Sequence, residues 1–243
     1  MTEGDRTGDW LAQFMTTEHF TLMSARSSSV SEANGRAALY LATLSSSIVA
    51  LALVAQISKI GTIFYVFAFV LLPMVFFLGV VTFERTLQST TEYFIYLRSI
   101  NRIRGFYAKT VPEIEKYFIM PPTDDPAATL RGVGIGSRWQ RFLTLAGTIA
   151  IINCLVAAVL AGLVAGVVLD RITSATSGIL LAASAAVGAV IFAVVAMASF
   201  SHQSRVFREN YGHQVPTMFP SAGGASPSQG YPVKGVDRPP RQE

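Results

Sequence analysis

The chain has 243 residues, of which 51% are hydrophobic and only 14% are charged, whereas a soluble domain is typically about 25% charged. The deficit is concentrated in four long stretches without any charged residue, which excludes an ordinary soluble domain and indicates an integral membrane protein. The net charge of +4 comes from basic residues that flank these stretches, so we expect contact with the phosphates of a lipid bilayer and no binding of nucleic acid.

The four uncharged segments are each long enough to cross a bilayer as a helix. About 20 apolar residues, at about 1.5 Å each, span a hydrocarbon core about 30 Å thick. The segments are residues 37–57, 61–83, 142–169 and 178–200. The links within each pair are short, so the predicted fold is all-α: a polytopic membrane protein whose four transmembrane helices form two antiparallel hairpins. Cytoplasmic amphipathic helices complete the prediction.

The distribution of Lys and Arg predicts the orientation. Seventeen of the 19 basic residues lie in residues 1–36, 84–141 and 201–243, and only Lys59 and Arg171 lie in the two hairpin links. Basic residues are enriched on the cytoplasmic side of a membrane. We therefore expect both termini and the long middle segment to be cytoplasmic, and the chain to reside in the cell (inner) membrane.

Residues 1–36 are expected to form a cytoplasmic arm that is helical in part. Trp10 and Phe14 are four residues apart, so their side chains can meet on one face of a helix. This pair could rest at the membrane interface, where aromatic rings are favoured. Equally, it could pack against the cytoplasmic helices of the protein itself.

Residues 84–141 are expected to form a cytoplasmic helical region that continues the second span. Apolar and aromatic residues recur there at intervals of three and four, which is typical of one stripe on an α-helix. The stripe consists of Tyr93, Tyr96, Ile100, Ile103 and Tyr107. It requires a partner, and we expect association through a cytoplasmic helix, a second subunit or the membrane surface.

Basic residues outside the stripe are expected to contact anionic lipid. They are Arg85, Arg98, Arg102, Arg141 and Arg205. Beyond the long helix, Pro112 predicts the start of a short helix that ends at Phe118, followed by a turn over residues 121–126. After Tyr211 the chain is rich in Gly, Pro and Ser, so the tail within residues 201–243 is expected to be mostly disordered.

Small residues in the third predicted span indicate close helix packing. Cys154, Ala158, Gly162 and Gly166 are spaced four apart, which places them on one helix face. Such a face can form a contact between subunits or can pack the third span against the fourth. The second interpretation is favoured because that partner is adjacent in the chain.

Catalytic and metal-binding patterns are lacking in the sequence. The single cysteine, Cys154, lies in an apolar stretch, and the three histidines are far apart, so we expect no cofactor, no metal site and no enzymatic activity. Within the predicted spans there is no Asp, Glu, Lys, Arg or His, and ion-coupled carriers usually need such residues.

Two sequence segments resemble uncharacterised multi-pass inner-membrane proteins of bacteria. The first runs from Thr17 to Arg36 and includes Thr17-Glu18-His19-Phe20-Thr21-Leu22, and the second is Ile100-Asn101-Arg102-Ile103-Arg104-Gly105-Phe106-Tyr107. The resemblance implies a bacterial cell-membrane protein and no activity to transfer.

Three functions are compatible with these patterns. The leading expectation is a non-enzymatic membrane protein that forms a homo-oligomer, or holds a cytoplasmic protein partner, through its cytoplasmic helices. An oligomeric pore or membrane-perturbing effector is the alternative, because spans of small residues without charges permit a dewetting gate. A small-molecule carrier that uses Ser45, Ser46 and Ser47 of the first span is the third.

Overall fold

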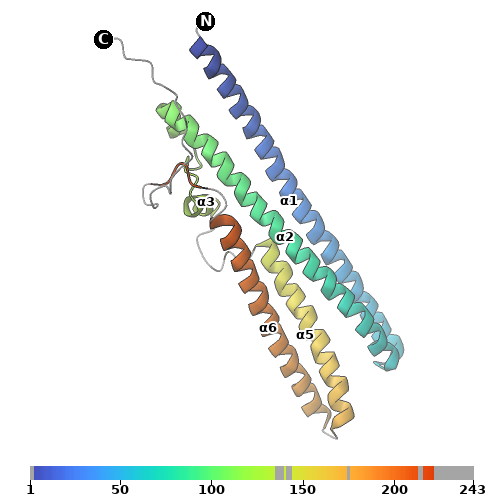
Figure 1. Cartoon of the computed structure of the whole chain (residues 1–243). Coiled ribbons are helices and arrows are strands. Elements are labelled where there is room, and N and C mark those ends of the chain that lie inside the picture. The colour runs from blue at the N-terminus through green and yellow to red at the C-terminus, as the bar shows by residue number, and fades with distance from the viewer. Residues whose placement is uncertain (1–2, 135–139, 141–143, 174–175, 213–215, 222–243) are drawn as a thin grey trace.

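The computed structural model describes residues 3–134, 140, 144–173, 176–212 and 216–221. Among these residues the regular secondary structure is entirely helical, without a β-strand. Four long helices form the body: α1 (Glu3–Ser58), α2 (Thr62–Thr110), α5 (Leu145–Ile172) and α6 (Ser177–Gly212) (Figure 1). Each is long and apolar enough to cross a membrane, in agreement with the four predicted spans. The chain is thus an all-helical protein suited to embedding in a membrane.

A tight turn joins α1 to α2. Lys59 and Ile60 have φ values of 49° and 58°, which is the left-handed region, and the Ile60 amide donates to the Ala55 carbonyl at 3.2 Å. The Gly61 amide donates to the Ser58 carbonyl at 2.9 Å, and α2 begins at the next residue. The two helices therefore run antiparallel and side by side (Figure 1).

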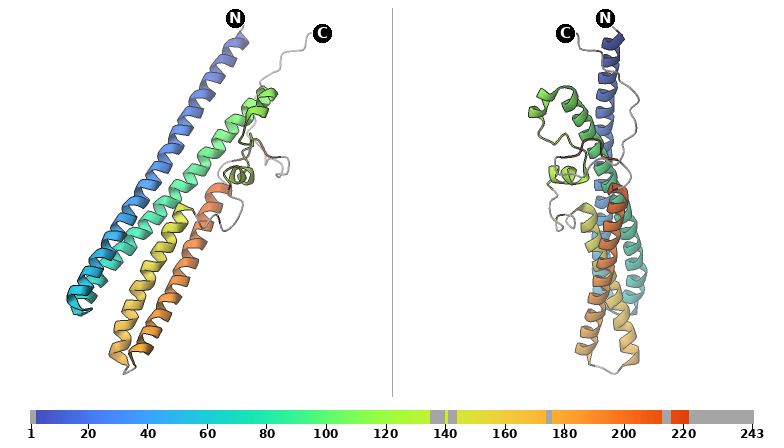
Figure 2. Two further views of the ribbon diagram at one scale, coloured as in Figure 1. Left: turned by 180° about the vertical axis from the view of Figure 1, so that it is seen from behind. Right: turned by 60° about the vertical axis from the view of Figure 1, so that its left-hand side comes forward.

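Helix α1 is continuous from Glu3 to Ser58, so the residues expected as a separate, partly helical arm and the first span belong to one helix. Helix α2 likewise runs through Pro73 and past Glu84 to Thr110. The two helices extend beyond α5 and α6 at one end of the molecule (Figure 2). We call this part the stalk; it comprises residues 3–36 of α1 and residues 84–110 of α2.

Helix α2 is the centre of the packing, because it contacts both α1 and α5, while α6 packs mainly on α5. Three helices meet where the Tyr40 hydroxyl approaches Asn153 Oδ1 at 3.5 Å beside Gly79. A Cβ atom added to Gly79 would overlap the side chain of Asn153 and lie 2.9 Å from the Tyr40 hydroxyl. Gly79 therefore permits this close approach of α1, α2 and α5.

The described residues between α2 and α5 include two short helices beside the stalk (Figure 2). The predicted short helix that starts at Pro112 is present as the 3-10 helix η1 (Pro112–Tyr117). The second, α3 (Pro126–Gly132), was not predicted. It begins where Asp125 Oδ1 accepts a hydrogen bond from the Ala128 amide at 2.8 Å, an N-terminal cap.

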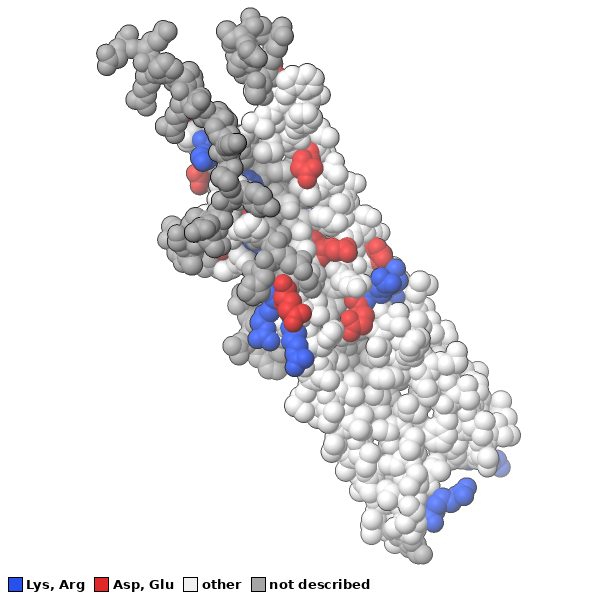
Figure 3. All heavy atoms as spheres, in the orientation of Figure 1, with Lys and Arg blue, Asp and Glu red and all other residues white. Residues whose placement is uncertain are grey.

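The two remaining long helices differ from the predicted spans at their ends. Helix α5 begins at Leu145, capped by Thr144, and passes Asp170 to end at Ile172, while residues 142–143 lie outside the described residues. Helix α6 continues past Phe200 as far as Gly212. Charged side chains gather on the stalk half of the molecule, and the other half is almost free of them until its tip (Figure 3).

Candidate functional site

A buried cluster in the stalk, past the middle of the α2 part, holds two of the arginines expected at the lipid surface. The Arg98 side chain is only 2% exposed, and its Nε donates to the Asp124 carbonyl at 2.9 Å. Arg102 donates from Nε and Nη2 to Asp124 Oδ2 at 2.9 and 2.8 Å. These two arginines are predicted to contact lipid. In the structure both guanidinium groups instead bind the turn before α3.

The same turn binds residues 216–221, which we call the C-terminal strap. The Asp124 carboxylate accepts hydrogen bonds from the amides of Met218, at 3.0 and 3.1 Å, and Phe219, at 2.7 Å. The Ser221 amide donates to Asp125 Oδ2 at 3.1 Å. The strap is thus held against the turn, although the tail after Tyr211 is predicted to be mostly disordered; residues 213–215 and 222–243 lie outside the described residues.

The strap lies against α2 because α2 has a glycine at the crossing point. A Cβ atom on Gly105 would come within 2.6 Å of both the Phe219 ring and the Pro122 carbonyl. Arg102 also donates to the Pro216 carbonyl, and Arg98 reaches the Thr217 hydroxyl at 3.5 Å. The cluster is therefore a structural junction between α2, the turn and the strap.

The predicted stripe on α2 is largely covered by the chain itself. Ile100 is fully buried and Ile103 is buried, and Tyr93 lies under Arg26 of α1, which donates to its hydroxyl at 2.9 Å. The Arg26 guanidinium carbon is 4.8 Å from the centroid of the Tyr93 ring, a cation–π distance. Tyr96 is half-buried. The stripe thus packs within one subunit.

The small residues of α5 also pack within the chain. A Cβ atom on Gly162 would lie 3.3 Å from the Ser184 carbonyl of α6, and one on Gly166 would lie 3.2 Å from the Ser184 hydroxyl. On the opposing helix, a Cβ atom on Gly188 would lie 2.9 Å from the Ala158 carbonyl. Cys154 is buried at the stalk side of this face. These positions of α5 therefore lie close to α6.

Two other basic residues lie just beyond the apolar parts of α2 and α6, where charged residues begin again in the sequence. Arg85 and Arg205 are exposed there, and Glu84 and His202 form an ion pair at 3.0 Å if the imidazole is protonated. Both arginines have side chains available to a lipid headgroup. Arg141 lies outside the described residues.

The face of α1 that points away from α2 carries a row of small residues, which gives no hydrophobic periodicity in the sequence. Members recur every three or four residues, and all are exposed. They are Thr17, Thr21, Ser24, Ser28, Ser31, Gly35, Ala38, Ala42 and Ser45. We call this set the outer face of α1. It is uninterrupted from the stalk into the apolar part of the helix.

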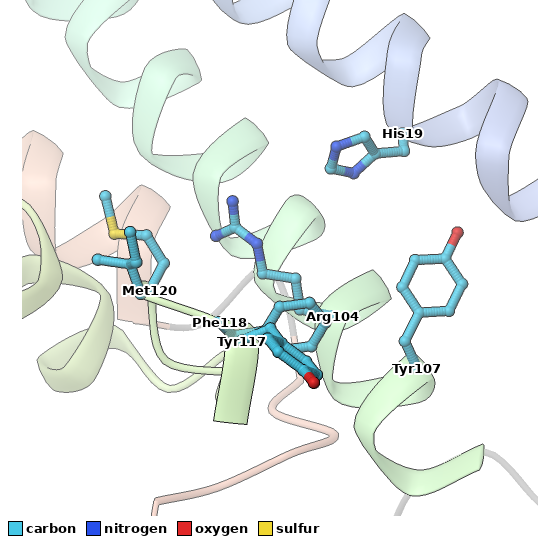
Figure 4. Close-up of a pocket in the computed structure, with 7 residues that line it drawn as sticks. His19, Arg104, Tyr107, Tyr117, Phe118 and Met120 are labelled. Atoms are coloured by element: carbon cyan, nitrogen blue, oxygen red, sulfur yellow. The ribbon is translucent and has the colours of Figure 1, made fainter. Parts of the chain in front are cut away.

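A cavity of about 380 Å³ lies in the stalk between α1, α2 and the segment that follows it (Figure 4). It is lined by His19, Arg104, Tyr107, Tyr117, Phe118, Ile119 and Met120. His19 Nδ1 is buried there without a hydrogen-bond partner. Burial, and secondarily the charge of Arg104, lower the pKa of His19 below its ordinary value. Burial likewise lowers the pKa of Arg104, with a further contribution from Arg26.

No metal centre is formed by the described residues, because they contain no group of three or more His, Cys, Asp or Glu side chains that could hold an ion. Comparisons with protein-family models, curated protein sequences and solved structures found no match to this chain.

Proposed function

We propose that this chain is a non-enzymatic integral membrane protein that self-associates along the outer face of α1. In this proposal α1 with α2, and α5 with α6, cross the membrane as two hairpins, and the stalk and both termini lie in the cytoplasm. The support is the charge distribution, since all but two of the 19 basic residues lie on one side of the four apolar segments.

The outer face of α1 supports self-association because its members are all exposed, so none of the described residues covers it. A Cβ atom on Gly35 would meet no atom within 4 Å, so intrachain packing does not require a glycine there. Glycine inside a helix costs about 1 kcal/mol relative to alanine. Small residues permit close approach of helix backbones in membranes, which increases dispersion contacts. If a second helix packs on this face, the glycine at position 35 permits its close approach.

The hydroxyl groups on this face are compatible with close packing. The Thr17 hydroxyl donates to the Gln13 carbonyl at 2.9 Å, and the Thr21 hydroxyl donates to the Thr17 carbonyl at 3.0 Å. Donors satisfied inside the helix carry no added cost when a partner displaces water. Their methyl groups remain available for contact.

A second copy is the partner that fits this face best. Copies inserted in one membrane share an orientation, so the same residues of two α1 helices stand at the same height above the bilayer. Trp10 and Phe14, which are 59% and 66% exposed and stacked at 6.3 Å, extend the apolar area at the stalk end. The observation that carries the proposal is the continuity of an exposed small-residue face through both the stalk and the apolar segment.

Cysteine cross-linking tests the proposal with two neighbouring residues. Ala42 lies in the middle of the outer face, whereas Thr43 is also exposed but lies about 100° further around the helix, outside that face. Ala42→Cys is expected to give disulfide-linked dimers in membranes, and Thr43→Cys is expected to give far fewer. Cys154 is buried, so the unmodified chain is a suitable blank. Equal cross-linking of the two variants would refute the proposed face.

An oligomeric pore is the second candidate, and the placement of two serines favours it. Ser45 and Ser46 are exposed within the apolar part of α1, although the Ser46 hydroxyl donates to the Ala42 carbonyl at 2.9 Å. If several α1 helices surround an axis, these hydroxyls are available to line it. Ion flux from liposomes that contain the purified protein separates the candidates, because a dimer without a pore leaves the liposomes sealed.

A further inference from the structure

The cavity in the stalk combines positive charge with apolar walls. Arg104 and the unpartnered Nδ1 of His19 provide the polar groups, and none of the seven lining residues is acidic. Arg104 Nη1 donates to Asn101 Oδ1 at 2.9 Å, which holds the guanidinium in place. A site with this charge and these donors favours an anion.

The other residues that line the cavity are aromatic or apolar, so they favour a ligand in which the anionic group is attached to an apolar part. Tyr107 of α2 stands opposite the segment that carries Tyr117, Phe118, Ile119 and Met120 (Figure 4). Tyr117 is 72% exposed and Ile119 is completely exposed, so large apolar groups at the cavity face water. Ligand sites are typically apolar with a few placed polar groups and have volumes of about 300–1,000 Å³.

We propose that this cavity binds a water-soluble organic anion, a carboxylate or phosphate monoester that carries an aromatic ring or a short acyl chain. The anionic group pairs with Arg104 and accepts a hydrogen bond from His19, and the apolar part covers Tyr117 and Ile119. Because the lining comes from α1, α2 and the segment from Tyr117 to Met120, the bound anion holds all three together. The inference does not depend on self-association of α1.

The distance from the membrane determines the source of the ligand. His19 lies 17 residues before Arg36 in the continuous α1, and 17 residues at about 1.5 Å each place it about 26 Å from that boundary. Arg104 lies 20 residues beyond Glu84 on α2, which corresponds to about 30 Å. A lipid anchored in the bilayer does not reach this height, so the anion comes from solution.

Calorimetric titration of the full-length protein in phosphatidylcholine nanodiscs tests the site. The probe is 4-phenylbutyrate, its uncharged control is 4-phenylbutanamide, and inorganic phosphate tests the anion alone. We expect phenylbutyrate to bind at one site per chain and the other two to bind at least about tenfold more weakly, as loss of a charge-assisted contact or of apolar burial predicts. Absence of phenylbutyrate binding, or equal binding of acid and amide, would overturn the proposal.

Matched variants assign the binding to this cavity. Arg104→Gln is expected to weaken phenylbutyrate at least about tenfold, whereas Lys109→Gln, which removes the same charge from the same helix outside the cavity, is expected to change it less than about twofold. Arg104→Lys, which keeps the charge, retains part of the affinity and separates charge loss from misfolding. Equal affinities for the two Gln variants contradict the assignment. Loss of probe binding when phosphatidylglycerol is added to the nanodiscs would identify a lipid occupant and refute a soluble one.

Discussion

Replacement of Asp124 by Asn is expected to release the C-terminal strap from the stalk. The two carboxylate oxygens accept hydrogen bonds from the Arg102 guanidinium and from the amides of Met218 and Phe219, and the side chain is completely buried. An amide of the same size keeps only one acceptor oxygen. Its NH₂ group must then face either the guanidinium or the strap amides, all of which are donors.

The magnitude follows from the burial of the ion pair. Removal of one partner of a buried charge pair typically costs about 3–5 kcal/mol, because the other charge stays buried without compensation. Arg102 is 29% exposed, so water can partly solvate it and the lower end of that range applies. About 3 kcal/mol corresponds to a population of the open strap that is larger by a factor of about one hundred.

Hydrogen exchange at the strap amides measures this population. In the wild-type protein the amides of Met218 and Phe219 are expected to be protected, and in Asp124→Asn they are expected to exchange about a hundredfold faster. Glu113→Gln is the control, because Glu113 is an exposed carboxylate on the neighbouring η1. Arg102→Gln should reproduce the effect from the other side of the pair. Unchanged protection at both amides in Asp124→Asn would show that Asp124 does not hold the strap.

Three further outcomes are expected. Ile60→Gly removes a β-branched residue from the left-handed region and should stabilise the protein by up to about 1 kcal/mol in reversible unfolding; a loss of stability would contradict the strain. His19 has a pKa lowered first by burial and then by Arg104, so the unfolded state binds its proton more readily and stability should fall as the pH drops below about 6.5. Thermal unfolding of His19→Leu should show a smaller loss over that range, and an identical loss would exclude His19. Gly188→Leu places a side chain against the Ala158 carbonyl and should cost about 1–3 kcal/mol by separating α5 from α6, whereas an unchanged unfolding temperature would show that the contact is not tight.

The apolar helices were predictable because their signal is local. A run of uncharged residues is visible without knowledge of the tertiary structure, and all four predicted spans lie in long helices. The ends of the helices were less predictable, because the third and fourth predicted spans end at Leu169 and Phe200 and the helices continue beyond these residues. A charge marks the edge of an apolar region without ending the hydrogen-bonding pattern of a helix.

The junction at Asp124 was not predictable from the sequence pattern. Arg98 lies outside the stripe and is predicted to contact anionic lipid, whereas its burial depends on the Asp124 carbonyl, 26 residues away. The strap has the Gly- and Pro-rich surroundings of a disordered tail, yet Met218 and Phe219 find acceptors on that aspartate. Long-range partners of this kind leave no periodicity in the sequence.

The stalk cavity and the outer face of α1 were missed for two different reasons. The cavity joins His19, Arg104 and Tyr117 from three separate segments, and only the tertiary fold brings them together. The outer face has a regular spacing in the sequence, but its members, such as Ser28 and Gly35, are not apolar, so a search for hydrophobic periodicity passes over them. The sequence does not show that this face is exposed, because its exposure depends on which side of α1 packs against α2.

The unbroken backbone of α1 has a mechanical consequence. Its 56 residues, at about 1.5 Å each, make a rod about 84 Å long without a hinge. A swing or twist applied near Trp10 is transmitted along the whole rod to the turn at Lys59, because no joint absorbs it. In the proposed membrane topology, force exerted on the tip of the stalk is thereby transmitted to the opposite side of the bilayer.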